Sequence, residues 1–475
     1  MQLVVDNNPP SLSIVGNEQA LLLDDITQHL PDMVDALRRL VAIPSWLQSG
    51  DVATPFGAGV QMCLDETLRM AAEMGFRTHK DVDGYYGWAE IGQGEELIGL
   101  LCHVDASPAP DEAAWFSSPL ELTERNGLLY GLGSQQCKGP LIAVLTAVAA
   151  LARHTSVLRR RIRIIVGTDA GTLARCMVRY ADQEEIPLFS LAPTGHGELV
   201  RGEKRILQAY LLGPGSSELS LHCGGELGLV PNRASYSGKH QKMLRKQLDL
   251  YGYPWLEEHD GTVVLGQAAS SGACADQGIN AITRLCRALN AIGYCHPALG
   301  FCSLIVGEDP RVRALLGRIE DISGSLSLNL ASLHMDETGS RIGIDIRIPV
   351  YLPYESFVVQ IRQSLAQLGW QFVEALHKEP LDITVADEVL AMLAESCYQV
   401  TGNQCEPIFS AEISYARALP NCIPFGALLS GFTDTRGLVN EHINCENLIM
   451  TAQIYALALS NLQNSPLQPV LGRQK

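Results

Sequence analysis

The sequence predicts an α/β protein in which a mainly parallel sheet, flanked by helices on both faces, is interrupted by an inserted α+β domain. Helical and strand-like patterns alternate through the first part of the chain, as is typical of such a sheet. After about residue 201 strands alternate with longer helices and glycine-rich turns, and the first pattern returns after Pro380. We therefore expect a loose leader over residues 1–17, a discontinuous domain over 18–200 and 385–463, an inserted domain over 201–384, and a tail over 464–475.

The first elements expected are helices. Apolar residues recur at helical spacing from Ala20 to Val41, and Pro44 follows the end of this helix. A second helix is expected over VQMCLDETLRMAAEM, which is closed by Gly75. The strands expected next cover residues 77–82 and 86–91.

An apolar strand over Leu97–Cys102 leads directly to His103 and Asp105. Residues i and i+2 of a strand face the same side, so this imidazole and carboxylate can share a metal site. Asp105 would then bind the metal or the second ring nitrogen of His103. The same pattern also fits a histidine at a strand end whose hydrogen bonds are satisfied within the protein.

The next helix is expected over residues 140–153, because this stretch is rich in Ala and Leu and Pro140 suits a first helical turn. A strand over 162–166 follows. Ligands of such sheets collect beyond the carboxyl ends of the strands, which is where His103, Asp169 and Thr194 would lie. The later elements expected are helices over 277–292, 386–400 and 444–462, a strand over 341–349 and a strand-like run over 424–429.

Composition narrows the classes of function. The 475 residues are 47% hydrophobic and 18% charged, with a net charge of −17, which argues against binding to nucleic acid through clustered Lys and Arg. Thirteen cysteines without a Cys-x-x-Cys spacing indicate free thiols in a reducing compartment. No basic segment precedes an apolar one at the N-terminus, and no apolar run is expected to span a membrane. We therefore expect a cytoplasmic protein that binds neither nucleic acid nor a membrane.

Several stretches of the chain, taken together, resemble one family of enzymes. They are LLCHVDASPAP, NGLLYGLGSQQCKGP, IRIIVGTDAG, LAPTGHGELVRGEK, GQAASSG followed by GINA, IGIDIRIP, ISYARALPN and GFTDTRGLVNEH. In this order and spacing they resemble the di-zinc acetylornithine deacetylase, succinyl-diaminopimelate desuccinylase and dipeptidase family, and within it the dipeptidase V (Xaa-His dipeptidase) branch. The resemblance implies a zinc-peptidase-like domain interrupted by a lid domain that closes over the substrate.

The same resemblance implies a two-zinc site that this chain has largely lost. In the family a bridging aspartate and terminal ligands hold two zinc ions, and a glutamate activates their shared water as general base. Matched by position, His103 stands at the first terminal histidine and Asp105 at its supporting aspartate. The other matched positions are Gln136 for the bridging aspartate, Ala170 for the general base, Gly171 and Thr194 for carboxylate ligands, Gly437 for the second terminal histidine, and Ser270 for a lid histidine that polarises the scissile carbonyl.

The residues that recognise the substrate's terminal carboxylate are better retained. The resemblance assigns this role to Arg347 and to the segment that contains Ser414 and Arg417, and a guanidinium suits a carboxylate bidentately. Asp345 stands where the family has an asparagine. The alternative is that each arginine pairs with a local acid such as Asp345 or Glu412.

Neighbouring residues offer an alternative, a rebuilt site for a single metal ion. The residues that would gather a single soft or borderline metal are His103, Asp105, Asp169 and His196. Such a site needs several independent replacements, and His196 also fits an ordinary loop histidine between two glycines. Cys137 would need a base within hydrogen-bond reach to act as a catalytic thiol, and His103 is the only nearby candidate.

Two functional hypotheses follow. The first is a pseudoenzyme of the dipeptidase fold, without a metal cofactor, that binds a small peptide-like ligand or a protein partner. The second is a metal-dependent dipeptidase or amidohydrolase that holds zinc or another divalent metal in a remodelled site. A structural subunit of a larger assembly is a third reading. Because the dipeptidase V branch tends to be monomeric, the resemblance also implies a monomer.

Overall fold

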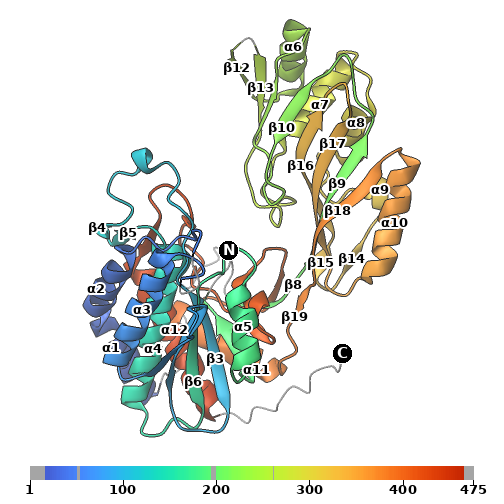
Figure 1. The fold of residues 1–475 in the computed structure, drawn as a ribbon. Helices are drawn as coiled ribbons and strands as arrows, with labels where there is room; N and C mark the ends of the chain where they lie inside the picture. The colour runs from blue at the N-terminus through green and yellow to red at the C-terminus, as the bar shows by residue number, and fades with distance from the viewer. Residues whose placement is uncertain (1–15, 51–53, 194–198, 260, 465–475) are drawn as a thin grey trace, which may run out of the picture. The chain divides into compact units, whose positions relative to one another are not determined.

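The chain divides into two compact units (Figure 1). The computed structural model describes residues 16–50, 54–193, 199–259 and 261–464, so most of the expected leader and tail lies outside the described residues. The first unit comprises Met1–Arg201, Ile383–Pro407 and Ser414–Lys475, and the second comprises Gly202–Asp382 and Ile408–Ile413. The short segment 408–413 therefore belongs to the inserted unit, whereas the sequence analysis placed it in the discontinuous domain.

The first unit is built on a six-stranded sheet. In spatial order its strands are β1 (Arg77–Lys80), β2 (Tyr86–Ile91), β6 (Arg161–Gly167), β3 (Leu97–His103), β7 (Phe189–Ala192) and β21 (Cys422–Pro424). β6, β3, β7 and β21 are parallel to one another, and β2 and β1 are added antiparallel at one edge. The sheet is therefore mixed. β3 and β6 are neighbours in its parallel part and end at the same edge of the sheet.

The first unit also contains helices, some of which pack directly on this sheet. They are α1 (Asn17–Gln28), α2 (Leu30–Val41), α3 (Ala58–Glu73), α4 (Gly139–His154), α5 (Arg175–Gln183), α11 (Asp387–Thr401) and α12 (Cys445–Asn464). Figure 1 shows α3 and α4 on one side of β3 and α5 on the other. α4 contacts β3, β6 and α12 and is buried almost throughout, since most of its residues are Ala, Leu, Val or Ile. This burial anchors the turn that precedes α4.

One helical stretch corrects the expectation about membrane spans. Residues Ser134–His154 form a helix that is long and apolar enough to cross a membrane. However, 89% of its apolar window is buried inside the protein, as expected of a core helix. The stretch therefore gives no reason to place the chain in a membrane.

The single helix expected from Ala20 to Val41 is in fact two helices. α1 ends at Gln28 and α2 begins at Leu30, with His29 between them. Pro31 lies in the first turn of α2, where its missing N–H is tolerated, but it cannot continue a helix that began earlier. The break is therefore a consequence of the proline inside the apolar repeat.

A small sheet ties distant parts of the first unit together. Its strands are β4 (Thr123–Arg125), β5 (Leu128–Tyr130) and β22 (His442–Asn444). Because β22 pairs with β5, residues just before β22 lie beside the turn that leads into α4. The strand-like run expected over 424–429 is wrong in its bounds, because β21 covers Cys422–Pro424 and shares only Pro424 with that run.

The second unit has an antiparallel sheet covered by helices. In spatial order the strands are β10 (Leu221–Gly224), β16 (Ser327–Met335), β17 (Ser340–Ile348), β9 (Arg205–Gly213) and β18 (Gln371–Lys378). Alternate residues of β17, Ile342, Ile344, Ile346 and Ile348, belong to its hydrophobic core. The helices are α6 (Gln241–Tyr251), α7 (Ala281–Ala291), α8 (Pro297–Gly300), α9 (Arg313–Leu316) and α10 (Tyr354–Gln367).

Smaller elements complete the second unit. They are the sheet of β11 (Arg233–Tyr236), β13 (Gly261–Leu265) and β12 (Trp255–Glu258), the pair β14 (Glu320–Asp321) and β15 (Gly324–Ser325), and the sheet of β19 (Leu381–Asp382), β8 (Val200–Glu203) and β20 (Ile408–Ser410). The helix expected over 277–292 begins only at Ala281. The reason is Asn280, whose side chain accepts hydrogen bonds from the N–H groups of Ile282 and Thr283 and so caps α7.

Candidate functional site

His103 is the last residue of β3, and it pairs in register with Gly167, the last residue of β6. Its Nδ1 lies 3.0 Å from the backbone oxygen and 3.2 Å from Oδ1 of Asp105. The imidazole is 7% exposed and meets the ring of Tyr415 edge-on, with 5.3 Å between ring centroids. The His103–Asp105 contact is the one that their spacing predicts, and it fixes the ring through Nδ1.

Asp105 also reaches the loop after β6. Its Oδ2 accepts a hydrogen bond of 2.9 Å from the backbone N–H of Gly171. A Cβ atom at Gly171 would lie 3.5 Å from that oxygen, so the position directly faces the carboxylate. Ala170 and Gly171, which match the family's glutamate pair, therefore lie beside the end of β3 but carry no acid.

Gln136 lies in the π-helical turn Ser134–Lys138, directly before α4. Its Oε1 accepts from the backbone N–H of Ser107 at 3.0 Å, and its Nε2 donates to Ser107 Oγ at 3.0 Å. Both atoms of the amide are thus engaged with one residue. A neutral amide held in this way is a poor substitute for a carboxylate that bridges two cations.

Glu441 also stabilises the turn that contains Gln136. Its carboxylate is fully buried and accepts hydrogen bonds from the backbone N–H groups of Gly133, Gln135 and Gln136 at 2.8–3.0 Å. Burial raises the pKa of Glu441, although these N–H groups act in the opposite direction. This role of Glu441 was not predictable from the sequence, because a glutamate that follows Asn440 in a loop carries no signal of burial.

Asp169 was expected as a replacement ligand, and its carboxylate is committed elsewhere. Oδ2 accepts from Nε of Arg175 at 2.9 Å and from the backbone N–H of Arg175 at 3.1 Å, and Oδ1 accepts from Thr172 Oγ1. Asp169 is fully buried, so this ion pair organises the start of α5. Thr194 and His196 lie outside the described residues.

Two further sequence candidates are placed clearly. Gly437 has a φ of +68°, a conformation that residues with a side chain rarely adopt, and nothing lies within 4 Å of a Cβ built there. Cys137 is 2% exposed, and burial raises the pKa of its thiol well above the ordinary value. A buried thiol of raised pKa is a poor nucleophile at neutral pH, which argues against a catalytic Cys137.

The described residues bring together few side chains that could bind the family's zinc ions. Among the described residues no three His, Cys, Asp or Glu side chains come together in an arrangement that could hold a metal ion. His103 and Asp105 remain a pair, while the matched positions at 136, 170, 171 and 437 offer an amide or no donor at all. The described residues therefore do not fit a two-zinc centre.

In the second unit Arg347 has a local carboxylate partner. Its Nε lies 2.8 Å from Oδ1 of Asp345 and its Nη2 3.3 Å from Oδ2, and Nη1 donates to the backbone oxygen of Ala411 at 3.0 Å. Both side chains are buried, and burial raises the pKa of Asp345 against the opposing effects of Arg347 and Gln208. The acid-paired alternative is thus the arrangement observed for Arg347.

Ser270, the residue that the resemblance matches to a lid histidine of the family, has a hydrogen-bond partner within the chain. Ser270 Oγ donates a hydrogen bond to Oε1 of Glu412, which lies in the short segment 408–413 of the second unit. Ser414 belongs to the first unit, where its Oγ accepts from the N–H of Ala416 and caps the short helix that contains Arg417. A shared role of Arg347, Ser414 and Arg417 in holding a carboxylate stays a prediction.

The chain belongs to the M20 peptidase family. The model of peptidase family M20/M25/M40 matches residues 99–461. The putative dipeptidase YtjP of Bacillus subtilis is 30% identical over 433 residues, which cover 86% of this chain and 92% of that protein. The putative dipeptidase SH1171 of Staphylococcus haemolyticus is 26% identical over 465 residues, or 92% of this chain and 98% of that protein.

Solved structures show the same fold. Human carnosine dipeptidase 1 aligns with a TM-score of 0.56 at 16% identity, over 96% of this chain and 100% of that one. The aminoacylhistidine dipeptidase of Vibrio alginolyticus aligns with a TM-score of 0.54 at 12% identity, over 91% and 96%. The family resemblance and the α/β fold class expected from the sequence are confirmed by these matches.

Proposed function

We propose that this chain is a dipeptidase-like member of the M20 family that does not hydrolyse peptides by two-zinc chemistry and instead binds a small peptide-like ligand. One observation carries the proposal. Gln136 stands at the bridging position, and both atoms of its amide are hydrogen-bonded to Ser107. A two-zinc centre depends on a negatively charged oxygen at this position, because that charge holds both cations.

The surrounding residues support the same reading. The loop after β6 presents the backbone N–H of Gly171 to Asp105 in the place where the family has a glutamate side chain. The nearest remaining acid in that loop, Asp169, is neutralised by Arg175. A general base and a second carboxylate ligand are therefore both lacking at the matched positions, while the hydrophobic core of the unit is intact.

The decisive experiment combines metal content with activity. The purified chain is loaded with zinc, manganese or cobalt, dialysed, and analysed for bound metal, and dipeptide hydrolysis is followed on the same samples. We expect well below one ion per chain and no metal-dependent hydrolysis. His103→Ala is the test variant, and His442→Ala is a control at another histidine of the first unit, one that is half-buried. About two ions per chain, lost in His103→Ala alone, would overturn the proposal.

Ligand binding is tested separately from catalysis. Dipeptides are added at about millimolar concentration and the unfolding temperature of the metal-free chain is measured, since a ligand that binds only the folded state raises it. We expect stabilisation by some dipeptides, and we expect that stabilisation to be lost in His103→Ala. Failure of every dipeptide would leave a protein partner as the remaining object of binding.

A metal-dependent dipeptidase with a remodelled site is the second candidate. The observation that favours it is the intact contact between His103 and Asp105, together with relatives described as putative dipeptidases. In that case zinc or another divalent metal would bind at His103, and hydrolysis would require added metal and disappear in His103→Ala. A cytoplasmic location and a monomeric state remain predictions that fractionation and light scattering check.

A further inference from the structure

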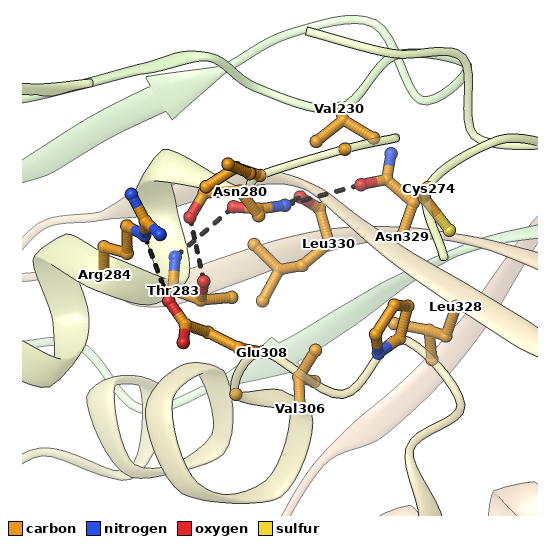
Figure 2. A pocket seen from close by; sticks show the side chains of 14 residues that line it. Val230, Cys274, Asn280, Thr283, Arg284, Val306, Glu308, Leu328, Asn329 and Leu330 are labelled. Atoms are coloured by element: carbon orange, nitrogen blue, oxygen red, sulfur yellow. Dashed lines mark hydrogen bonds and ion pairs between the residues drawn. The ribbon is translucent and has the colours of Figure 1, made fainter. Parts of the chain in front are cut away.

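A cavity of about 230 Å³ lies within the second unit (Figure 2). It is bounded by the start of α7 and the residues before it, by the segment after Val306 and by the first residues of β16. None of the residues that line it belongs to the candidate site of the first unit, and none matches a catalytic position of the family. The cavity therefore needs an explanation that is separate from the candidate site of the first unit.

The walls of the cavity are mainly apolar. Val230, Val306, Leu328 and Leu330 line it, and each is at most 4% exposed. A cavity of roughly 150 Å³ with walls of this kind accommodates benzene, with six non-hydrogen atoms. By that comparison this cavity suits a molecule of about nine to ten non-hydrogen atoms, the size of leucine.

The neutral polar side chains at the cavity are already engaged. Asn280 donates to the backbone oxygen of Leu330 at 2.6 Å while its Oδ1 caps α7. Thr283 Oγ1 donates to the backbone oxygen of Asn280 at 2.9 Å, and Asn329 donates to Leu229 and Ser271. These groups shape the cavity without offering a strong site for a charged ligand.

One end of the cavity carries opposite charges side by side. Arg284 Nε lies 3.0 Å from Oε1 of Glu308, and Figure 2 shows both side chains at the same end of the pocket. The guanidinium of Arg284 also lies over the ring of Tyr253, 4.6 Å from its centroid, which holds it in place. Its side chain is 17% exposed, whereas Glu308 is 49% exposed.

We propose that this cavity binds a free apolar α-amino acid such as leucine. The apolar side chain enters the cavity, the carboxylate pairs with the Nη groups of Arg284, and the ammonium pairs with Glu308. A guanidinium and a carboxylate 3.0 Å apart match the two opposite charges of an α-amino acid, whose ammonium and carboxylate groups are bonded to the same carbon. The proposal rests on the second unit alone and does not depend on whether the first unit is catalytic.

The test measures binding of leucine and phenylalanine to the full chain by calorimetry and by thermal unfolding, up to about 10 mM ligand. Three probes separate the contributions. 4-Methylpentanoate lacks the ammonium, 3-methylbutylamine lacks the carboxylate, and serine lacks the apolar side chain. We expect leucine to bind at least about tenfold more tightly than each of them, because every probe loses one charged contact or the apolar one.

Matched variants locate the site. Arg284→Gln is expected to weaken leucine binding at least about tenfold, while Arg287→Gln is expected to change it less than about twofold. Arg287 lies on the same helix and donates to Tyr253, but it does not line the cavity. Val306→Phe fills the cavity and is expected to abolish binding, whereas Leu304→Phe, at a position that is 73% exposed, is expected to leave it unchanged.

Three results would overturn the proposal. They are the absence of leucine and phenylalanine binding at about 10 mM, binding that survives both Arg284→Gln and Val306→Phe, and equal affinity for leucine and 4-methylpentanoate. Should Val306→Phe fail to fold, Glu308→Gln replaces it, since this partly exposed side chain can change without disturbing the core. Leucine binding that is unaffected by Glu308→Gln then counts against the proposal.

Discussion

The carboxylate of Asp105 accepts a hydrogen bond of 2.9 Å from the backbone N–H of Gly171. This contact joins the residue that supports His103 to the loop in which the family's general base would stand. In this chain the aspartate thus serves two protein partners, an imidazole and a backbone amide. Its role can be explained by structure alone, without a metal.

Replacement of Asp105 should therefore lower stability. Asp105 is 3% exposed, and Asp105→Ala removes the carboxylate that accepts from the N–H of Gly171 and lies beside Nδ1 of His103, which then keeps only the backbone oxygen of residue 105. We expect a loss of about 2–3 kcal/mol in the free energy of unfolding, measured from the urea transition of the metal-free chain. Asp182→Ala, at an exposed position on α5, should change it by less than about 0.5 kcal/mol. An Asp105→Ala variant as stable as the parent would show that the two contacts do not matter.

Glu441 predicts a pH dependence of stability. Burial raises its pKa in the folded chain above the ordinary value of 4.5, so between 4.5 and the raised value the folded state binds more protons than the unfolded state. The contribution of Glu441 to the free energy of unfolding therefore falls as pH rises through this window. In Glu441→Gln this contribution should disappear, as seen in urea midpoints measured from about pH 4 to about pH 8.

The same substitution also affects stability at neutral pH. In Glu441→Gln the glutamine Nε2 would face a backbone N–H group that now donates a hydrogen bond to Glu441. Two donors would then face each other without an acceptor. We expect Glu441→Gln to lose about 1–3 kcal/mol at pH 7, and the exposed Glu446→Gln to lose almost nothing. Equal pH profiles for the two variants and the parent would contradict the assignment.

The sequence was most informative where one chemical pattern dominates. The apolar run that ends at His103 predicted a buried strand, and the spacing of His103 and Asp105 predicted their contact. The break of the first helix at His29 could also have been expected, because Pro31 interrupts the apolar repeat. Patterns of local periodicity and of proline placement act within a few residues, so one sequence shows them.

Contacts between distant residues were not predictable in the same way. Glu441 caps a turn some three hundred residues earlier in the chain, and only the pairing of β22 with β5 brings them together. The antiparallel strands β1 and β2 likewise follow from packing at the sheet edge rather than from their own composition. Asp169 looked available as a ligand because its partner, Arg175, is revealed only by the fold of the loop.

The pair Arg347 and Asp345 allows two readings of Arg347 to be separated. If the arginine is held by the buried ion pair, Asp345→Asn and Arg347→Gln should each lower the free energy of unfolding, by about 3–5 kcal/mol for the first. The double variant should lose clearly less than the sum, with a coupling energy of about 2–3 kcal/mol. The measurement is a double-mutant cycle of urea transitions.

A different result would support the interpretation that Arg347 binds the carboxylate of a ligand. If the coupling energy were below about 0.5 kcal/mol and Arg347→Gln removed stabilisation by dipeptides, the guanidinium would be acting on a ligand carboxylate rather than on Asp345. Arg341→Gln is a suitable control, because Arg341 lies on the same strand, is exposed and contacts the ring of Tyr210. That variant should leave both stability and dipeptide binding close to those of the parent.

Gly437 determines how far a metal site could be restored by substitution. Its φ of +68° suits glycine, and nothing lies within 4 Å of a Cβ built there, so any loss on substitution comes from the backbone rather than from a clash. We expect Gly437→Ala and Gly437→His to lose similar amounts, about 1–2 kcal/mol, and Gly437→Asn to lose less, because asparagine tolerates this conformation. Thermal unfolding of the three variants checks this order.

The zinc uptake of combined variants completes that argument. Gln136→Asp with Gly171→Glu places two carboxylates near His103, and a Cβ at Gly171 makes only an ordinary contact with Asp105 Oδ2, at 3.5 Å. We expect this variant to take up more zinc than the parent, measured by elemental analysis after dialysis. Addition of Gly437→His should give little further zinc, because the backbone conformation at residue 437, with a φ of +68°, is unfavourable for a histidine. A full second ion on that addition would mean that the loop changes conformation readily and that Gly437 is not a barrier to the family's chemistry.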